Sequence, residues 1–345
     1  MSDSKKTEPV TTALLRSNGN SSPIHPHHDL RLDRIPQLMT LNVVALMPAH
    51  QEEKDIQASL TSLINQTYPV TIVVLANGCT DATVEKAQLA AGDNLNVFIE
   101  DLPKLPHKKS EAMNFGYLKY AQAADLVITV DADTMLNQTT IEEWVKEFEE
   151  NPKLGGSCAR FTMRGTSLIT RLQRLDFSIG IDFNLHRGKS DVLPGAGSCF
   201  RGDILKHLST WDDREGPWTY VSAVEDFEVT YQIQRMGFHT RTSPTARAYT
   251  DPMSTWKALR GQRMKWNCGT IEDLISFGLN RTTRLMWCQQ ILTLFSILLT
   301  ALLVVFMVYI SFDGQWTFNL RSLPLMVGIP LLVWMKSIKH SLRMP

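Results

Sequence analysis

The sequence predicts an α/β fold, a doubly wound, mostly parallel sheet that is followed by a C-terminal transmembrane helix or hairpin. From residue 42, short apolar runs alternate with helical segments, and such repeats are typical of parallel sheets with helices on both faces. Residues 291–310 are apolar and uncharged, and a helix of about 20 such residues matches a bilayer core. We therefore divide the chain into a disordered N-terminal tail (1–38), a main domain (39–280) and membrane-spanning segments within 285–340.

The strands and helices of the main domain follow from local apolar patterns. The expected strands are 42–47, 71–76, 96–100 and 126–130. The expected helices are 55–66, 81–91, 109–122 and 139–151. Ligands of such sheets bind beyond the carboxyl ends of the strands. The polar loops at 48–53, 77–81 and 131–133 are therefore predicted to meet in one crevice.

Composition excludes several classes of protein. Lys plus Arg and Asp plus Glu each number 35, so no global positive field indicates nucleic acid as a partner. The five cysteines are scattered without a C-x-x-C pair, which argues against a disulfide scaffold or a zinc site. Neither a G-x-G-x-x-G nor a G-x-x-x-x-G-K-[ST] motif is present, which argues against a dinucleotide-binding dehydrogenase and a P-loop enzyme.

The C-terminal part is predicted to lie in and at a membrane. A second apolar run at 323–335 is marginal in length, so it either crosses or re-enters. Basic residues flank the apolar pair, and the positive-inside rule then places the main domain on the cytoplasmic side. Amphipathic helices at about 166–188 and 254–280 are expected to contact membrane lipids at the interface, although 166–188 also fits an ordinary surface helix.

Two carboxylates end the apolar run 126–130. Asp131 and Asp133 follow it directly, at the expected tip of a core strand. Because desolvation of carboxylates is costly, a cation or a phosphate-bearing ligand is expected there. Mg²⁺ takes one or two carboxylates together with substrate phosphates, which fits this pair.

Seven short motifs occur in a fixed order along the main domain. They are PAHQEE (48–53), ANGCTD (76–81), HKKSEAMNFG (107–116), DAD (131–133), GAGSCFR (195–201), VEDFEV (224–229) and QRMKW (262–266). In this order they resemble the processive, membrane-bound branch of family 2 glycosyltransferases, to which cellulose, hyaluronan, chitin and poly-N-acetylglucosamine synthases belong. The resemblance covers residues 43 to about 269 and implies a GT-A-type fold.

The resemblance implies a donor site for a nucleotide-sugar. Glu52 would lie by the nucleoside, Asn77 would accept the uracil imide hydrogen, and Lys109 would meet phosphate or sugar. Asp131 would contact sugar or ribose, and Asp133 would hold Mg²⁺ or Mn²⁺ against the diphosphate. The full set of implied donor residues is Pro48, Ala49, Glu52, Asn77, Lys109, Asn114 and Asp131.

The resemblance also implies an acceptor site and a catalytic base. Asp226 would take the proton of the acceptor hydroxyl. Arg263 and Lys265 would pair with the diphosphate, and Lys265 stands where the family has Arg. The implied acceptor residues are Gly197, Ser198, Glu225, Gln262 and Trp266.

Some of these residues also fit plainer roles. Glu52, Glu225 and Asp226 could simply favour helix N-termini. Asp81 fits an N-cap, and Trp266 fits an amphipathic anchor near the membrane. Gln51 and Asn77 replace the Asn and Asp that are usual in the family, so the uridine assignment rests on an uncharged amide.

These observations predict a membrane-anchored, inverting, metal-assisted glycosyltransferase. The donor is expected to be a UDP-sugar, with UDP-N-acetylglucosamine favoured, and the acceptor a glycan or a lipid-linked molecule. Family polymer synthases carry further membrane spans, so a homo-oligomer or a translocation subunit is an expected partner. The alternatives are a single-sugar transferase to a lipid-linked or protein acceptor and a non-catalytic scaffold that binds nucleotide-sugar or glycan.

Overall fold

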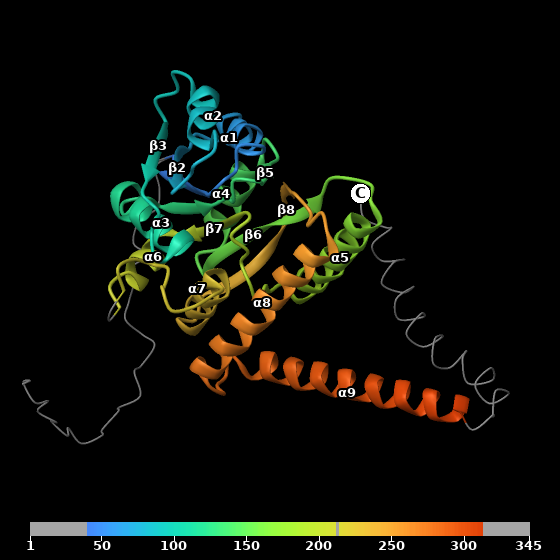
Figure 1. Ribbon diagram of the computed structural model, residues 1–345. Helices are drawn as coiled ribbons and strands as arrows, with labels where there is room; N and C mark the ends of the chain where they lie inside the picture. Colours follow the sequence, from blue (N-terminus) through green and yellow to red (C-terminus); the bar gives the residue numbers. More distant parts are fainter. Residues whose placement is uncertain (1–39, 212–213, 313–345) are drawn as a thin grey trace, which may run out of the picture. The chain divides into compact units, whose positions relative to one another are not determined.

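The computed structural model describes residues 40–211 and 214–312 (Figure 1). The expected tail at 1–38 and the second apolar run at 323–335 lie outside the described residues. Within them, eight strands form one sheet in the order β3-β2-β1-β4-β7-β6-β8-β5. The predicted mostly parallel α/β sheet is thereby confirmed.

The N-terminal half of the sheet is the predicted β-α series. Strands β1 (Val43–Ala49), β2 (Thr71–Asn77), β3 (Val97–Leu102) and β4 (Leu126–Thr129) pair in parallel. The residues of β1, β2 and β4 are almost all buried because helices cover both faces. The three predicted polar loops therefore leave the sheet at the same edge.

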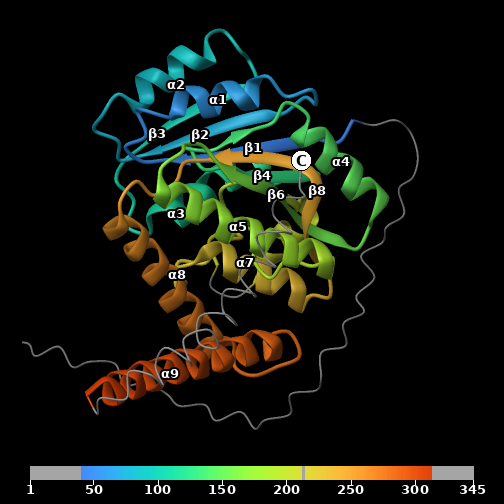
Figure 2. The same cartoon turned by 90° about the vertical axis from the view of Figure 1, so that its right-hand side faces the viewer.

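Helices lie on both faces of this half, as expected for a doubly wound sheet (Figure 2). Helices α1 (Ile56–Ile64) and α2 (Thr83–Ala91) lie on one face. Helix α3 (Lys108–Gly116), which continues into the π-helix η1 (Tyr117–Ala121), lies on the other. Helix α4 (Thr140–Glu150) buries Trp144 and Phe148 in the core. Each predicted helix is present, with ends that differ by a few residues.

The other half of the sheet was not predicted from the sequence. It contains β5 (Met135–Leu136), β6 (Leu154–Met163), β7 (Ser198–Arg201) and β8 (His239–Thr250), with β7 antiparallel to both β4 and β6. Near the start of β6 lie Gly155 and Gly156, where an added Cβ would collide with Ile233 and Leu193, respectively. Close packing thus requires glycines that weaken the strand pattern. Helices α6 (Gly202–Leu208) and α7 (Glu225–Arg235) belong to this half.

Three long helices complete the described part of the chain. The predicted amphipathic segments form α5 (Leu168–Arg187) and α8 (Trp256–Phe277), which begin at the capping residues Ser167 and Thr255. Helix α9 (Arg284–Phe312) contains a stretch of 23 residues, Arg284–Phe306, that is long and apolar enough to cross a membrane, and none of its most apolar window is buried. Among the described helices it is the one candidate span.

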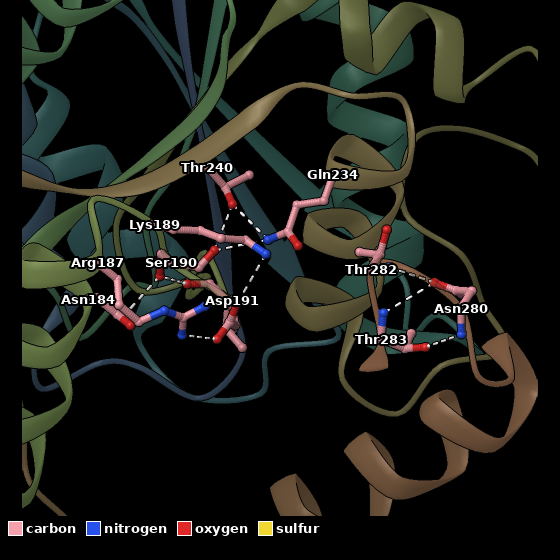
Figure 3. Close-up of polar contacts among 11 residues, drawn as sticks. Asn184, Arg187, Lys189, Ser190, Asp191, Gln234, Thr240, Asn280, Thr282 and Thr283 are labelled. Atoms are coloured by element: carbon pink, nitrogen blue, oxygen red, sulfur yellow. Dashed lines mark hydrogen bonds and ion pairs between the residues drawn. The ribbon is translucent and has the colours of Figure 1, made fainter. Parts of the chain in front are cut away.

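A polar turn connects α8 to α9. Asn280 Oδ1 accepts hydrogen bonds from the backbone N–H groups of Thr282 and Thr283, at 2.9 and 3.1 Å (Figure 3). The Thr283 hydroxyl donates back to the Gly278 carbonyl at 2.7 Å. This turn fixes the start of α9, whose Met286 packs with Val224 and Leu274 in a small second core.

Candidate active site

Two cavities meet at the carboxyl edge of the sheet. The first, of about 410 Å³, is formed by the loops after β1, β2 and β4 and by α3, and the second, of about 530 Å³, by the loop before β7, the start of α7 and helices α5 and α8. Lys109, Asp131 and Asp133 line both cavities. The first cavity also contains Pro48, Ala49, Glu52 and Asn77. The second also contains Glu225, Asp226, Gln262, Lys265 and Trp266.

The loops after β1 and β2 are joined by Gln51. Strand register sets Ala49 beside Ala76, so the two loops emerge together. The Gln51 side chain then accepts from the Thr80 backbone N–H at 2.8 Å and donates to the Thr80 hydroxyl at 2.7 Å. Gln51 has φ of 60°, a left-handed conformation that costs a non-glycine residue about 1 kcal/mol or more. The longer Gln in place of Asn thus holds the first loop against the second.

Asn77 and Asp81 both make contacts within these loops. Asn77 Oδ1 accepts from the Leu105 backbone N–H at 2.9 Å, so one of its lone pairs is already engaged. Asp81 accepts from the Thr83 hydroxyl and backbone N–H at the start of α2, and from the Glu53 N–H at 3.1 Å. Asp81 therefore accepts from the first residue of α2, but the N-cap of this helix is Ala82, one residue later than predicted.

An excess of negative charge lies where the two cavities meet. Burial, followed by the charge of Asp131, raises the pKa of Asp133 to about 6. Burial and then Asp133 raise the pKa of Glu52 to about 7. Among the described residues, Asp133 has no ion pair, and its Oδ1 accepts only from the Thr134 hydroxyl, at 3.1 Å. A cation bound here would stabilise the charged forms of both Asp133 and Glu52.

The residues fit a divalent metal ion whose remaining ligands come from the phosphates of the substrate. The described part of the chain contains no group of three metal-ligating side chains. Mg²⁺ and similar ions in transferases are held by one or two carboxylates and by the phosphates of the substrate, so three protein ligands are not required. Asp133 supplies such a carboxylate, which has no ion pair among the described residues and lines both cavities.

Lys109 connects the first cavity to the second. Its Nζ lies 2.5 Å from Asp131 Oδ1 and 3.3 Å from Glu225 Oε1. Burial lowers the pKa of Lys109, but Asp131 and Glu225 more than reverse this and raise it, so the ammonium stays charged. Gly195 approaches so closely that an added Cβ would lie 2.6 Å from Nζ.

Glu225 and Asp226 have opposite protonation behaviour. Burial raises the pKa of Glu225, but the Lys109 charge outweighs this and holds it below its usual value. Burial and the charge of Glu225 raise the pKa of Asp226 to about 6. Both residues lie in the first turn of α7, where carboxylates favour the helix N-terminus, as their positions predicted. Asp226 is therefore a carboxylate with a pKa near neutrality, as a general base requires.

Helix α8 brings part of the QRMKW motif to the second cavity. Gln262, Lys265 and Trp266 line it, and Trp266 packs edge-to-face on Phe177 of α5, with ring centroids 6.4 Å apart. Arg263 is not among the lining residues. Its guanidinium pairs with Asp176 at 2.7 Å and lies 4.7 Å from the centre of the Trp266 ring. Lys265 therefore reaches the second cavity, whereas Arg263 does not.

Three further predicted site residues lie outside both cavities. Asn114 is buried, donates to the Trp218 carbonyl at 2.7 Å and accepts from the Trp218 N–H at 3.0 Å. Gly197 and Ser198 lie behind the cavity wall, where the Ser198 hydroxyl donates to the Pro194 carbonyl at 2.7 Å. The members of that loop that reach the cavity are residues 194–196.

A polar network fixes the start of this loop (Figure 3). The Ser190 carbonyl accepts from the Thr240 hydroxyl at 2.6 Å and from Gln234 Nε2 at 3.0 Å. Arg187, at the end of α5, pairs with Asp191 at 2.6 Å. The network joins α5, α7 and β8, and it sets the path of the chain toward residues 194–196.

Sequence reasoning missed the walls of the second cavity. Phe161 and Met163 come from β6, Gln173 comes from α5, and Asp251 directly follows β8. Asp251 also contributes to the raised pKa of Asp133, after burial and Asp131. Because β6 and β8 carry no strong strand pattern, no signal in the sequence connected these residues with the site.

Comparison with known proteins assigns the chain to a family. The model described as Glycosyl transferase family group 2 matches residues 126–337, more than half of the chain. The chain belongs to glycosyltransferase family 2. The transferase is 26% identical over 314 residues to the probable glycosyltransferase YdaM of Bacillus subtilis strain 168, a match that covers 85% of this chain and 70% of the relative.

Two further comparisons extend this assignment. The transferase is 23% identical over 257 residues to the poly-β-1,6-N-acetyl-D-glucosamine synthase of Staphylococcus epidermidis, covering 72% of this chain and 60% of the synthase. The solved mannosyltransferase PcManGT from Pyrobaculum calidifontis, in complex with GDP-Man and Mn²⁺, has a TM-score of 0.55 at 18% identity and covers 73% of this chain and 70% of its own. This likeness supports the GT-A-type fold that the motifs predicted.

The buried Asn114 leads to a prediction about stability. We expect Asn114→Ala to lower the free energy of unfolding by about 2–4 kcal/mol, because it leaves a buried N–H and carbonyl of Trp218 unpaired. Thermal unfolding of the purified transferase in detergent measures this. Asn65→Ala, at an exposed position at the end of α1, is the matched control and should change stability by less than about 0.5 kcal/mol. Equal stability of the two variants would contradict the structural role of Asn114.

Proposed function

We propose that this transferase moves a sugar from a nucleotide-sugar to a glycan or lipid-linked acceptor with inversion of the anomeric centre. The observation that carries the proposal is the junction of the two cavities. Lys109, Asp131 and Asp133 line both, with nucleotide-loop residues on one side and Asp226 and Trp266 on the other. A donor in the first cavity and an acceptor in the second would bring their reacting atoms together at this junction.

The chemistry follows from the placement of charge. Asp226 would accept the proton of the acceptor hydroxyl while its oxygen attacks the anomeric carbon and the bond from that carbon to the diphosphate breaks. Asp133 would hold a divalent cation, which supplies positive charge against the leaving diphosphate. Lys265 would add a second cation on the acceptor side. A single displacement of this kind inverts the configuration at the anomeric carbon.

We favour a UDP-sugar as donor, with UDP-N-acetylglucosamine first. The support is the relative from Staphylococcus epidermidis, which is named a synthase of poly-β-1,6-N-acetyl-D-glucosamine. The solved neighbour binds GDP-Man, so the fold by itself does not select the nucleoside. In this chain Asn77 Oδ1 retains one lone pair for a uracil imide hydrogen beside its bond to Leu105.

We propose that α9 anchors the transferase in a membrane with the catalytic domain on the cytoplasmic side. The candidate span Arg284–Phe306 and the basic residues beside it support this orientation. Exposed apolar residues on α5 and α8, including Leu172, Phe183 and Ile275, fit an interfacial position of these helices. For polymer synthesis we propose a homo-oligomer or a translocation subunit as the partner that builds the channel.

The direct test uses the detergent-purified full chain with a panel of UDP-sugars and GDP-mannose, with and without Mg²⁺ or Mn²⁺. Release of nucleoside diphosphate and the size of the product are followed together. Metal-dependent release with a ladder of products supports a polymerising transferase, whereas one added sugar supports single transfer. Donor binding without turnover on any acceptor would contradict the proposal and favour a scaffold.

The proposed base leads to a pH prediction. We expect kcat/KM to fall as the pH drops through about 6, because protonated Asp226 cannot accept the acceptor's proton and its pKa is raised to about 6. Protonation of Asp133 acts in the same direction by weakening cation binding. Rates are measured from pH 5 to 8.5 at saturating metal, and donor binding is measured separately to isolate the second effect. A profile that stays flat down to pH 5 would contradict the assignment of Asp226.

A further inference from the structure

A third cavity, of about 760 Å³, lies apart from the site described above. It is formed by the loop before α7, the outer face of α7, the C-terminal end of α8 and the turn that leads to α9. It shares no lining residue with the two cavities of the sugar-transfer site. The proposed reaction therefore leaves this cavity without a role.

The cavity carries an excess of positive charge among the described residues. Three arginines line it: Arg214, Arg235 and Arg281. Arg214 is neutralised by a buried ion pair with Glu228. The other acidic residue of the cavity, Asp273, accepts a hydrogen bond from the Ser222 hydroxyl at 2.7 Å.

Arg235 and Arg281 keep hydrogen-bond donors available at the rim. Both side chains are exposed, and neither has an ion pair within the described ranges. Arg235 lies 5.8 Å from the centre of the Trp211 ring, a contact that leaves the in-plane N–H groups of the guanidinium free. Two guanidinium groups at the rim of one cavity are suited to a phosphate group.

The same rim is also apolar. Val221, which lines the cavity, is 94% exposed, and Leu279, between α8 and Arg281, is 77% exposed. Tyr231 and Phe277 stack with ring centroids 3.9 Å apart and form a flat aromatic wall. A cavity that combines cationic donors with exposed aliphatic side chains fits an amphiphile better than a soluble anion.

The position of the cavity relative to α9 indicates the source of the phosphate. Arg281 precedes the first residue of the candidate span, Arg284, by three positions, which is less than one helical turn. If α9 enters a bilayer there, the rim lies at the depth of the lipid headgroups. Basic residues beside a span attract anionic lipids.

We propose that this cavity binds the headgroup of an anionic phospholipid. Arg235 and Arg281 hold the phosphate diester, and the acyl chains leave over Val221 and Leu279. This inference rests on the proposed membrane anchoring by α9 but is independent of the donor and of the reaction. A soluble phosphate ester shares the phosphate chemistry but lacks the acyl chains.

Lipid retention by the full chain tests the proposal. The protein, purified in detergent, is titrated with phosphatidylglycerol or phosphatidylcholine, and bound lipids are counted by native mass spectrometry. We expect phosphatidylglycerol to bind at least tenfold more tightly than phosphatidylcholine. The double variant Arg235→Gln/Arg281→Gln should lose this preference, and Arg281→Lys should retain most of it.

The matched control removes two positive charges elsewhere. Lys153→Gln/Lys206→Gln takes the same charge from exposed positions before β6 and on α6, outside the helices proposed to contact the membrane, and should leave phosphatidylglycerol binding within about twofold. An equal loss in both double variants would overturn the proposal in favour of a diffuse surface charge. Glycerol phosphate serves as a soluble phosphate ester without acyl chains. If it bound as tightly as phosphatidylglycerol, the lipid proposal would also be overturned. Nucleotide-sugar binding confirms that each variant is folded.

Discussion

Replacing Asp226 by Asn is expected to lower kcat by about 10²–10⁴-fold while donor binding stays within a few fold of the original. The amide keeps the size of the side chain and its place at the start of α7 but cannot accept a proton from the acceptor hydroxyl. It also removes the carboxylate whose pKa is raised to about 6 beside Glu225. The measurement is the initial rate of diphosphate release at saturating donor and metal, with the donor Kd determined in parallel.

The matched control for this variant is Asp93→Asn, which makes the same change at an exposed loop position. Its kcat should equal that of the unmodified protein. If Asp226→Asn retained most of kcat, the base would have to be another group of the second cavity, and Glu225 would be the next to test. Loss of donor binding together with kcat would instead indicate that the variant disturbs the Lys109–Glu225 contact.

Replacing Asp133 by Asn is expected to have the second large effect, about 10³-fold on kcat/KM, with loss of the dependence on Mg²⁺ or Mn²⁺. The reason is that Asp133 is the carboxylate of the junction that has no ion pair among the described residues. Isothermal titration of Mn²⁺ in the presence of a nucleoside diphosphate measures metal binding directly. An unchanged metal affinity would contradict the assignment of Asp133 as ligand.

Although Asp133→Asn is expected to lower activity, it is expected to stabilise the metal-free protein. Because burial and Asp131 raise the pKa of Asp133 to about 6, the charged form is disfavoured in the folded protein. At pH 8 without metal, Asp133→Asn should therefore raise Tm, and the gain should shrink as the pH falls through about 6. A lower Tm at pH 8 would show that the carboxylate stabilises the metal-free protein. Gain of stability together with loss of metal response distinguishes a ligand from a structural residue.

The sequence predicted most of the first half of the domain. Strands β1, β2 and β4 are continuous apolar runs because helices bury both of their faces, and such runs are visible without a structure. The polar loops after these strands were correctly expected to meet, since parallel strands end at one edge of the sheet. Glu52, Asn77, Lys109, Asp131 and Asp133 therefore line one cavity, as the motifs implied.

Other positions of the same motifs turned out differently. Asn114 and Ser198 make internal hydrogen bonds, and Arg263 pairs with Asp176. In each case the motif identifies the segment correctly, but packing decides which side chain reaches the cavity. On a helix such as α8, neighbouring residues point in directions about 100° apart, so Gln262 and Lys265 can line the cavity while Arg263 does not.

The sequence alone thus determined the β-α series, the carboxylates at its edge and the apolar helix at the C-terminal side, because each depends on local periodicity. Only the tertiary structure decided how the second cavity is built. Its walls come from β6, β8, α5 and α8, and the lining residues Phe161 and Trp266 are 105 positions apart in the sequence (266 − 161) and share no pattern. Contacts of this kind form only when the whole chain packs, because no local property of either segment encodes its partner.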